Sequence, residues 1–426
     1  MKPNVSNFLK TLGPGLIFAS TAIGVSHLVQ STRAGANYGY GLLWAVCLAN
    51  LCKYPFFEFG SRYANATGKS LIDGYKRLHT GMLWLYFLIT LGSMFFVSAA
   101  VGAVTAGFLD NLFGVSQMIS NGTMITTIVL FASCIGILLI GKFNALDGLM
   151  KVIGVVMLLS TLGAFFLSLH KGPAAELSWF LPPSEWQGTD IAFIIALMGW
   201  MPTAVDMSTW NSLWTIERIR ETGYKPKLKE TLLDFNLGYI VTSLLAICFV
   251  TLGAYMIFGS GKVMPESSGA FANAVVTLYT QTMGNWTYVI IAASAFSIMF
   301  GTSIAVFDGY ARSIERTTEL LFLSGDKAND SNLHKKFYSG SLLVVGLGSL
   351  LIIVLFGKSM KQLVDFATTM SFLIAPVIAI ANHILVTKKY ISEEAVPPLW
   401  LRTLSWLGIL FLLAFSVYFL VNRGGS

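Results

Sequence analysis

The chain has 426 residues, of which 55% are hydrophobic and only 12% are charged, and its mean hydropathy is +0.69. A soluble domain carries about twice that charged fraction, so the composition excludes a large soluble domain and predicts an all-α polytopic membrane protein. The formal net charge of +7 is not evidence for a nucleic-acid partner, because excess Lys and Arg in a membrane protein mostly determine its orientation in the bilayer. We therefore expect no nucleic-acid partner.

Eleven apolar segments are long enough to cross a bilayer, and we expect them to form one transmembrane transporter domain over residues 1–426. The eighth segment is long enough to begin outside the membrane. In chain order, the expected spans are 13–34, 40–60, 82–109, 122–141, 146–169, 190–215, 232–258, 270–308, 337–356, 363–386 and 398–421.

Loop charges predict how these spans are oriented. If the N-terminus is cytoplasmic, most Lys and Arg residues fall in cytoplasmic loops and few fall in external loops. We therefore expect a plasma-membrane protein, in the inner membrane of a bacterium. Its N-terminus would be cytoplasmic and its C-terminus outside, which fits an odd number of spans.

Two spans contain residues that interrupt a helix. The first has Gly24 followed by polar Ser26 and His27 in its middle, and the sixth carries Pro202 and Asp206 near its middle. A proline removes a helix hydrogen bond, and an unpaired carboxylate is costly in hydrocarbon. Such segments persist where they line an enclosed or wet cavity, so we expect a binding site between the two breaks.

The two breaks lie five predicted helices apart. That spacing is typical of two inverted five-helix repeats with a substrate site between the first helix of each. We expect repeat one at about 13–169, repeat two at about 190–386 and an extra helix at about 398–421. This pattern predicts a secondary transporter that works by alternating access.

Several residues near the breaks are candidate substrate ligands. Asp206 is a cation ligand or proton carrier, or else a structural acid that is bonded to freed backbone groups or paired with a lysine. His27 could ligate a transition metal when neutral, or hold an anion or relay a proton when charged; the alternative is a packing histidine. Met201 offers a soft thioether, or simply fills the core. The expected substrate-binding residues are Gly24, Ser26, His27, Met201, Thr203 and Asp206.

Four further charged residues are candidates for coupling or gating. Arg33 ends the first span, where it could lie over an outward vestibule or anchor the helix at the interface. Glu58 lies near the expected cytoplasmic end of the second span. Asp234 opens the seventh span and Asp308 lies near the end of the eighth, and for both residues a structural role is the favoured interpretation.

Enzyme signatures are weak or absent. The chain has no phosphate-binding loop and no His-Glu-x-x-His motif, and its intramembrane acids form no evident catalytic pair. We therefore expect no enzymatic activity and no cofactor. The expected partners are the transported ion and the lipid bilayer.

Short sequence stretches along nearly the whole chain share the pattern of one family. They are Gly13-Pro14-Gly15, Gly35-Ala36-Asn37-Tyr38-Gly39-Tyr40-Gly41, Ala66-Thr67-Gly68-Lys69, Met201-Pro202, Leu233-Asp234 and Gly301-Thr302. With them the chain resembles the Nramp (natural resistance-associated macrophage protein) family of divalent metal transporters. The resemblance implies a LeuT-like fold with eleven helices.

The metal-binding signatures of that family are altered here. The positions that match its helix 1 signature Asp-Pro-Gly-Asn are Gly24, Val25, Ser26 and His27, so the aspartate is absent. Its helix 6 signature Met-Pro-His-Asn matches Met201-Pro202 literally. Counted back from Ser212-Leu213, it instead begins at Thr203.

Two functions remain open from the sequence. In the first, a divalent metal is held by a rebuilt site of Asp206, His27 and Thr203. In the second, the same fold carries a small anion or zwitterion, such as bicarbonate, a carboxylate or an amino acid, drawn by half-helix N-termini, His27 and Arg33. The residue that faces the cavity, Asp206 or His27, distinguishes them. A non-transporting relative is the third alternative.

Overall fold

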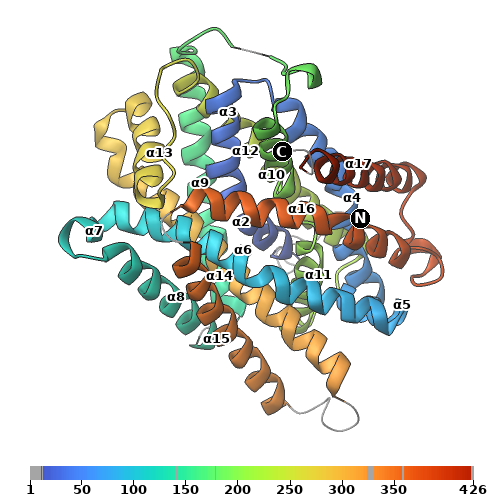
Figure 1. Ribbon diagram of the computed structural model, residues 1–426. Coiled ribbons are helices and arrows are strands. Elements are labelled where there is room, and N and C mark those ends of the chain that lie inside the picture. Colours follow the sequence, from blue (N-terminus) through green and yellow to red (C-terminus); the bar gives the residue numbers. More distant parts are fainter. Residues whose placement is uncertain are drawn as a thin grey trace.

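The computed structural model describes residues 11, 13–140, 143–177, 179–323, 331–356 and 359–423, and within these ranges the chain is helical without a strand (Figure 1). The α-helices are α2 (Pro14–Ala22), α3 (Thr32–Tyr38), α4 (Leu43–Thr67), α5 (Leu71–Leu78), α6 (Thr80–Phe113), α7 (Val115–Met118), α8 (Gly122–Ile140), α9 (Phe143–Lys171), α10 (Gly188–Gly199), α11 (Met207–Thr222), α12 (Leu228–Met256), α13 (Ser268–Met283), α14 (Tyr288–Phe322), α15 (Ser331–Phe356), α16 (Met360–Leu385) and α17 (Leu399–Arg423).

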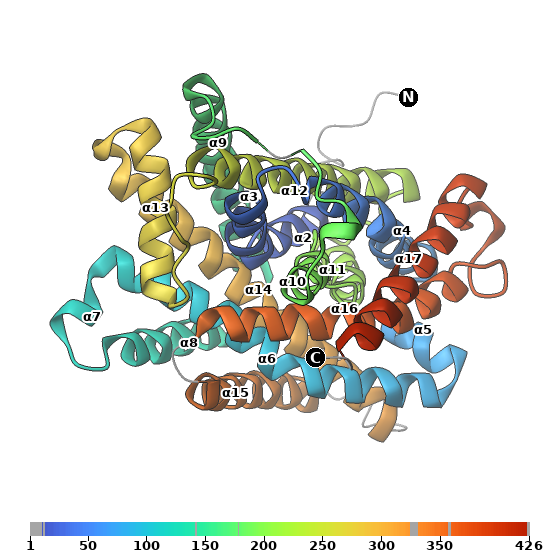
Figure 2. The ribbon, with the colours of Figure 1, turned by 45° about the horizontal axis from the view of Figure 1, so that its top comes forward.

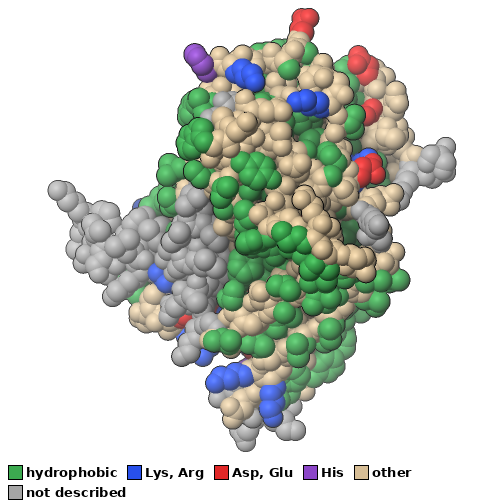
Figure 3. All heavy atoms as spheres, turned by 90° about the vertical axis from the view of Figure 1, so that its left-hand side faces the viewer, with side chains coloured by type: hydrophobic (Ala, Val, Ile, Leu, Met, Phe, Trp, Pro, Cys, Tyr) green, Lys and Arg blue, Asp and Glu red, His purple; other side chains and the backbone are tan. Residues whose placement is uncertain are grey.

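Seven helices in the described part of the chain are long and apolar enough to cross a membrane. They are α6, α8, α12, α14, α15, α16 and α17. Helix α14 overlaps the second part of the eighth predicted span, and the others match the predicted spans 3, 4, 7 and 9 to 11. Figure 3 shows hydrophobic side chains across the middle of one face, with charged side chains gathered toward its upper and lower ends. The all-α membrane class is therefore confirmed, while the count of eleven spans stays a prediction.

The first predicted span is broken where the glycine and polar residues indicated. Helix α2 ends at Ala22, Ile23 and Gly24 are not helical, and the chain resumes as a π-helix at Ser26–Ser31 before α3. A Cβ atom on Gly24 would lie 2.6 Å from the Thr302 Oγ1 atom, so only glycine lets this segment lie so close to α14.

The sixth predicted span is broken as well. Helix α10 ends at Gly199, residues 200–206 are not helical, and α11 begins at Met207. Pro202 cannot donate a backbone hydrogen bond, which explains why the helix does not continue through it. A Cβ atom on Gly199 would lie 2.0 Å from the Thr368 carbonyl oxygen, so α10 ends in close contact with α16.

The eighth predicted span, 270–308, is wrong as a single segment. The structure divides it into α13 and the longer α14, with a turn at Gly284 between them. Gly284 has φ 100°, a backbone conformation that residues with a Cβ atom rarely adopt, so the glycine accounts for the turn.

Both broken spans lie inside the bundle. Figures 1 and 2 place α2, α10 and α11 at its centre, with α17 at the edge. We call the basic end the part of the bundle formed by α5 and the last turns of α14, where Lys76 Nζ donates to the Leu320 carbonyl at 2.6 Å. Helices α7 and α13 lie toward the opposite end.

Candidate functional site

The two breaks meet at a small buried cavity of about 30 Å³. That volume has room for about one or two waters or a single bare ion. Its wall comes from α2, the π-helix, α6, the 200–206 segment, α11 and α14. The lining residues are Thr21, Ala22, Val25, Ser26, Val97, Val101, Trp200, Thr203, Ala204, Asp206, Met207, Trp210, Thr302, Val306 and Tyr310.

Asp206 is the one charged residue of this lining. It is half-buried, whereas the other lining residues are buried, which indicates that its side chain borders the open space. The carboxylate interacts electrostatically with Lys53 and accepts from its own backbone N–H. It forms no ion pair with any residue that the structure describes, so its charge remains available to a ligand.

Three more residues with potential ligand atoms line the cavity with Asp206. The Thr203 hydroxyl donates to the Met207 sulfur at 2.6 Å, and both residues line the cavity. Ser26 lines it from the π-helix. A carboxylate, two hydroxyls and a thioether therefore surround a space of ionic size. Sequence reasoning missed Met207, although its position one residue after Asp206 could have suggested it.

Three expected ligands, Gly24, His27 and Met201, do not line the cavity. The Met201 side chain is fully buried in the apolar cluster on the other side of the break, which includes Ile195 and Phe372. Gly24 contacts Thr302 without bordering the space, and the contact leaves no room there for a side chain. The structure thus brings Thr203, rather than Met201, to the cavity.

His27 is directed away from the cavity and toward α12. Its Nε2 atom lies 2.9 Å from the Thr242 carbonyl oxygen and its Nδ1 atom 2.7 Å from the Ser26 hydroxyl. Because a carbonyl only accepts, Nε2 carries a proton in this contact, while the Ser26 hydroxyl donates to the Ala22 carbonyl at 2.5 Å and also lies against Nδ1. Its ring also packs edge-on against Phe249. Both ring nitrogens are thus occupied by protein groups.

Arg33 lies on α3, outside the cavity lining, and joins that helix to its neighbours. It donates to both carboxylate oxygens of Asp365 on α16, at 2.7 and 3.0 Å, and to Gln30 at 2.9 Å. Its guanidinium also lies over the Phe193 ring of α10, 4.9 Å from the centroid. The Arg33–Asp365 pair links α3, which continues the π-helix, to α16. It lies on the side of the bundle away from the basic end.

The other three gating candidates have protein partners. Asp234 of α12 accepts from the backbone N–H groups of Gly13 and Gly15 at 3.2 and 2.7 Å, which caps the start of α2. Glu58 pairs with Arg62 one turn further along α4. None of the three lines the cavity between the breaks.

Asp308 has the largest set of partners among them. It accepts from Trp214 Nε1 at 2.9 Å, from Arg312 Nε at 2.9 Å and from the Tyr338 hydroxyl at 2.7 Å. It therefore joins α11, α14 and α15 at the basic end.

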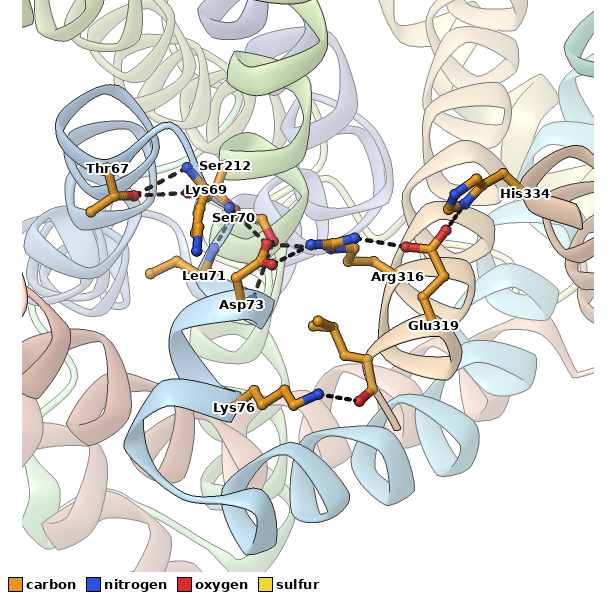
Figure 4. Close-up of polar contacts among 11 residues, drawn as sticks. Thr67, Lys69, Ser70, Leu71, Asp73, Lys76, Ser212, Arg316, Glu319 and His334 are labelled. Atoms are coloured by element: carbon orange, nitrogen blue, oxygen red, sulfur yellow. Dashed lines mark hydrogen bonds and ion pairs between the residues drawn. The ribbon is translucent and has the colours of Figure 1, made fainter. Parts of the chain in front are cut away.

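A second group of charged residues lies at the basic end (Figure 4). Arg316 of α14 contacts Asp73 of α5 and donates to Glu319 at 2.7 Å, and His334 of α15 contacts Glu319. Glu315, Glu319 and His334 place three potential ligand atoms within 4.8 Å of one another. Because Arg316 already neutralises Glu319, we assign this group to contacts between helices.

Asp73 is held in its charged form by this contact. Burial alone would raise the pKa of its carboxyl, but hydrogen bonds and charge from Arg316 outweigh that effect. They hold the pKa below its usual 3.8. The Asp73–Arg316 contact between α5 and α14 is therefore an ionised pair at neutral pH.

A helical bundle whose first and sixth spans break around a central cavity is the arrangement of a secondary transporter. Comparisons with known proteins agree. Residues 15–422 match the family model described as natural resistance-associated macrophage protein-like. The uncharacterized protein PM0681 of Pasteurella multocida is 34% identical over 418 residues, which cover 97% of this chain and 92% of that protein.

More distant relatives agree as well. The divalent metal cation transporter MntH of Staphylococcus saprophyticus is 22% identical, over 96% of this chain and 91% of its own length. The solved structure of the Eremococcus coleocola manganese transporter superposes with a TM-score of 0.73 at 13% identity, covering 98% of this chain and 87% of that one. This likeness confirms the predicted LeuT-like fold.

The chain belongs to the natural resistance-associated macrophage protein-like (Nramp) family. The resemblance read from the sequence motifs is therefore confirmed. Members of this family are transporters, so the prediction that the chain is not an enzyme is confirmed as well.

Proposed function

We propose that this chain is a secondary-active transporter of a divalent transition-metal ion such as Mn²⁺ or Fe²⁺, with a rebuilt binding site. The observation that carries the proposal is the free carboxylate of Asp206, which borders a cavity of ionic size between the two helix breaks. The family and the metal named in its relatives' descriptions support the same cargo.

Asp206 would take over the role of the acid missing at Gly24. Its carboxylate would bind the cation directly, with the Thr203 and Ser26 hydroxyls as neutral oxygen ligands. The Met207 sulfur would add a soft ligand, which favours Mn²⁺ or Fe²⁺ over Mg²⁺ and Ca²⁺. His27 would position the π-helix against α12 instead of ligating the metal.

An anion is the less suitable cargo for this cavity. A free carboxylate bordering it would repel a bicarbonate or carboxylate ion, and neither His27 nor Arg33 lines it to compensate. This argument favours the cation among the two functions left open by the sequence.

The transport cycle that we propose is alternating access, with the N-terminus cytoplasmic and the C-terminus outside. The outer closure would be the Arg33–Asp365 pair between the π-helix region and α16. The inner closure would combine the Asp234 cap on α2 with the Asp73–Arg316 contact between α5 and α14. Ion binding at the breaks would shift the balance between these closures.

Uptake of Mn²⁺ into proteoliposomes, measured with a fluorescent metal indicator, tests the proposal. We expect saturable uptake by the wild type and its loss in Asp206→Asn, which keeps the shape and removes the charge. Glu266→Gln is the matched control, because that acid is exposed and pairs only with Lys361 in the described structure. Uptake by Asp206→Asn equal to that of the wild type would contradict the proposed site.

A further inference from the structure

Lys53 is a fully buried cation with no carboxylate partner at bonding distance in the described structure. Its Nζ atom donates to three backbone carbonyl oxygens, those of Met198 at 2.6 Å, Gly199 at 2.8 Å and Thr203 at 3.2 Å. The first two carbonyls belong to the last turn of α10, and the third belongs to the non-helical segment after it. A side chain from α4 therefore binds backbone carbonyls that lie before and within the break in the sixth span.

The three carbonyl oxygens of Met198, Gly199 and Thr203 surround the Lys53 ammonium as ligands surround a bound cation, and we call them the carbonyl cage. A lysine ammonium has three N–H donors, and here each has a carbonyl acceptor. Carbonyls at a helix C-terminus lack their helical partners and carry partial negative charge, which favours a cation. Burial of an ammonium is costly without such partners, so the three carbonyls are the groups that compensate for the burial of Lys53 inside the bundle.

Free cations are bound in the same way in broken-helix transporters, where unwound carbonyls coordinate a sodium ion or a proton. We propose that Lys53 is a tethered monovalent cation. Its ammonium fills the carbonyl cage at the break of the sixth span, in place of a free Na⁺ or K⁺. This inference deepens the proposed function because the same break supplies Thr203 and Asp206 to the cargo site.

The placement has a consequence for the cargo site. Since the ammonium is satisfied by carbonyls, it fixes the Thr203 backbone without forming an ion pair with Asp206, although the two charges interact through space. The carboxylate stays free for the transported ion. No dissolved monovalent cation is then needed to stabilise the carbonyls at the break. Transport of the cargo ion would therefore be independent of Na⁺ and K⁺.

The test measures thermal unfolding of the purified full-length protein, by intrinsic tryptophan fluorescence, in choline, sodium and ethylammonium chloride. Wild type is expected to unfold at one temperature in all three salts. Lys53→Ala empties the cage and is expected to unfold about 5 °C lower in choline. Ethylammonium, which supplies an ammonium and part of the missing stem, should restore most of that loss, and Na⁺ part of it.

Two further variants complete the design. Lys53→Met fills the space without charge, so it should lose stability and gain nothing from ethylammonium. Lys361→Ala, at an exposed lysine that pairs with Glu266, should behave as wild type in every salt. If Lys53→Ala cannot be purified in choline, extraction in ethylammonium is expected to recover it.

Either of two results would overturn the inference. One is Lys53→Met as stable as the wild type, and the other is Lys53→Ala destabilised equally in all three salts. Because these measurements contain no transported metal, they stand apart from the cargo experiment. A chain that fails to carry Mn²⁺ but shows the ammonium rescue would lose the proposed function and keep the tethered cation.

Discussion

At the scale of single residues, the cavity combines hard oxygen ligands with one soft sulfur ligand. Asp206 and Met207 both line it, and the Met207 sulfur accepts a hydrogen bond from the Thr203 hydroxyl. A thioether contributes little to binding a hard ion such as Mg²⁺ and more to binding a softer transition metal. In the proposed site, Met207 would therefore determine the selectivity among divalent ions, and Asp206 would supply the negative charge.

Met207→Leu replaces the sulfur by carbon at nearly the same volume. We expect the affinity for Mn²⁺ and Cd²⁺ to fall about tenfold, with little change for Ca²⁺, because only the soft ligand is lost. Competition binding on the purified protein measures this ratio. Met201→Leu is the control, since that side chain is buried away from the cavity, and an equal effect of both substitutions would refute the assignment.

His27→Gln tests whether this histidine packs or ligates. Loss of its two buried hydrogen bonds should lower the free energy of unfolding by about 1–3 kcal/mol, while metal affinity stays near that of the wild type. Chemical denaturation and metal titration on the same preparation report the two effects separately. Unchanged stability with lost metal binding would return His27 to the ligand set.

The sequence could predict part of this site and not the rest. Asp206, Thr203 and Ser26 are polar residues beside two helix breaks, and such residues must border a cavity or find partners. The orientation of His27 depends on the Thr242 carbonyl of α12, which lies 215 positions away in sequence. The contact of Lys53 with the end of α10 could not be predicted for the same reason, because tertiary packing decides which groups a side chain contacts.

At the scale of elements, two charged contacts are the closures that we propose for the transport cycle. The Arg33–Asp365 pair joins the π-helix region to α16, and the Arg316–Asp73 contact joins α14 to α5 (Figure 4). Both pairs are partly exposed, since the Asp365 side chain is 31% and the Arg316 side chain 37% exposed, so each contributes modestly to stability. In the cycle that we propose, such contacts would separate and re-form as whole helices move.

Arg33→Gln and Asp365→Asn test the first closure as a pair. Each single substitution leaves a charge without its partner and is expected to slow Mn²⁺ uptake several-fold. The double variant should be no slower than the worse single one, because the two residues act through one contact. Uptake assays of all four proteins give the coupling, and purely additive effects would contradict a shared role.

At the scale of the whole molecule, hydropathy and helix breakers predicted most of the fold. Long apolar runs indicated spans, and Gly24 and Pro202 marked both breaks. The eighth span was misjudged because apolar residues continue on both sides of the turn at Gly284. Hydropathy reports which residues avoid water, and a single glycine in an apolar run carries too little signal to predict a turn.

The predicted count of eleven spans places the two termini on opposite sides of the membrane. Alkaline phosphatase fused after Arg423 should be active in the periplasm, and green fluorescent protein at the same position should be dark. The same reporters at the N-terminus should give the opposite result. Fluorescence at both ends would mean an even number of spans and would contradict the predicted topology.

The most direct test of the central claim is calorimetric titration of Mn²⁺, Mg²⁺ and bicarbonate into the purified wild type and Asp206→Asn. The account predicts saturable heat with Mn²⁺ for the wild type, weaker or no heat with Mg²⁺, and no Mn²⁺ signal for the variant. Equal Mn²⁺ binding by both proteins, or binding of bicarbonate without any metal, would contradict it.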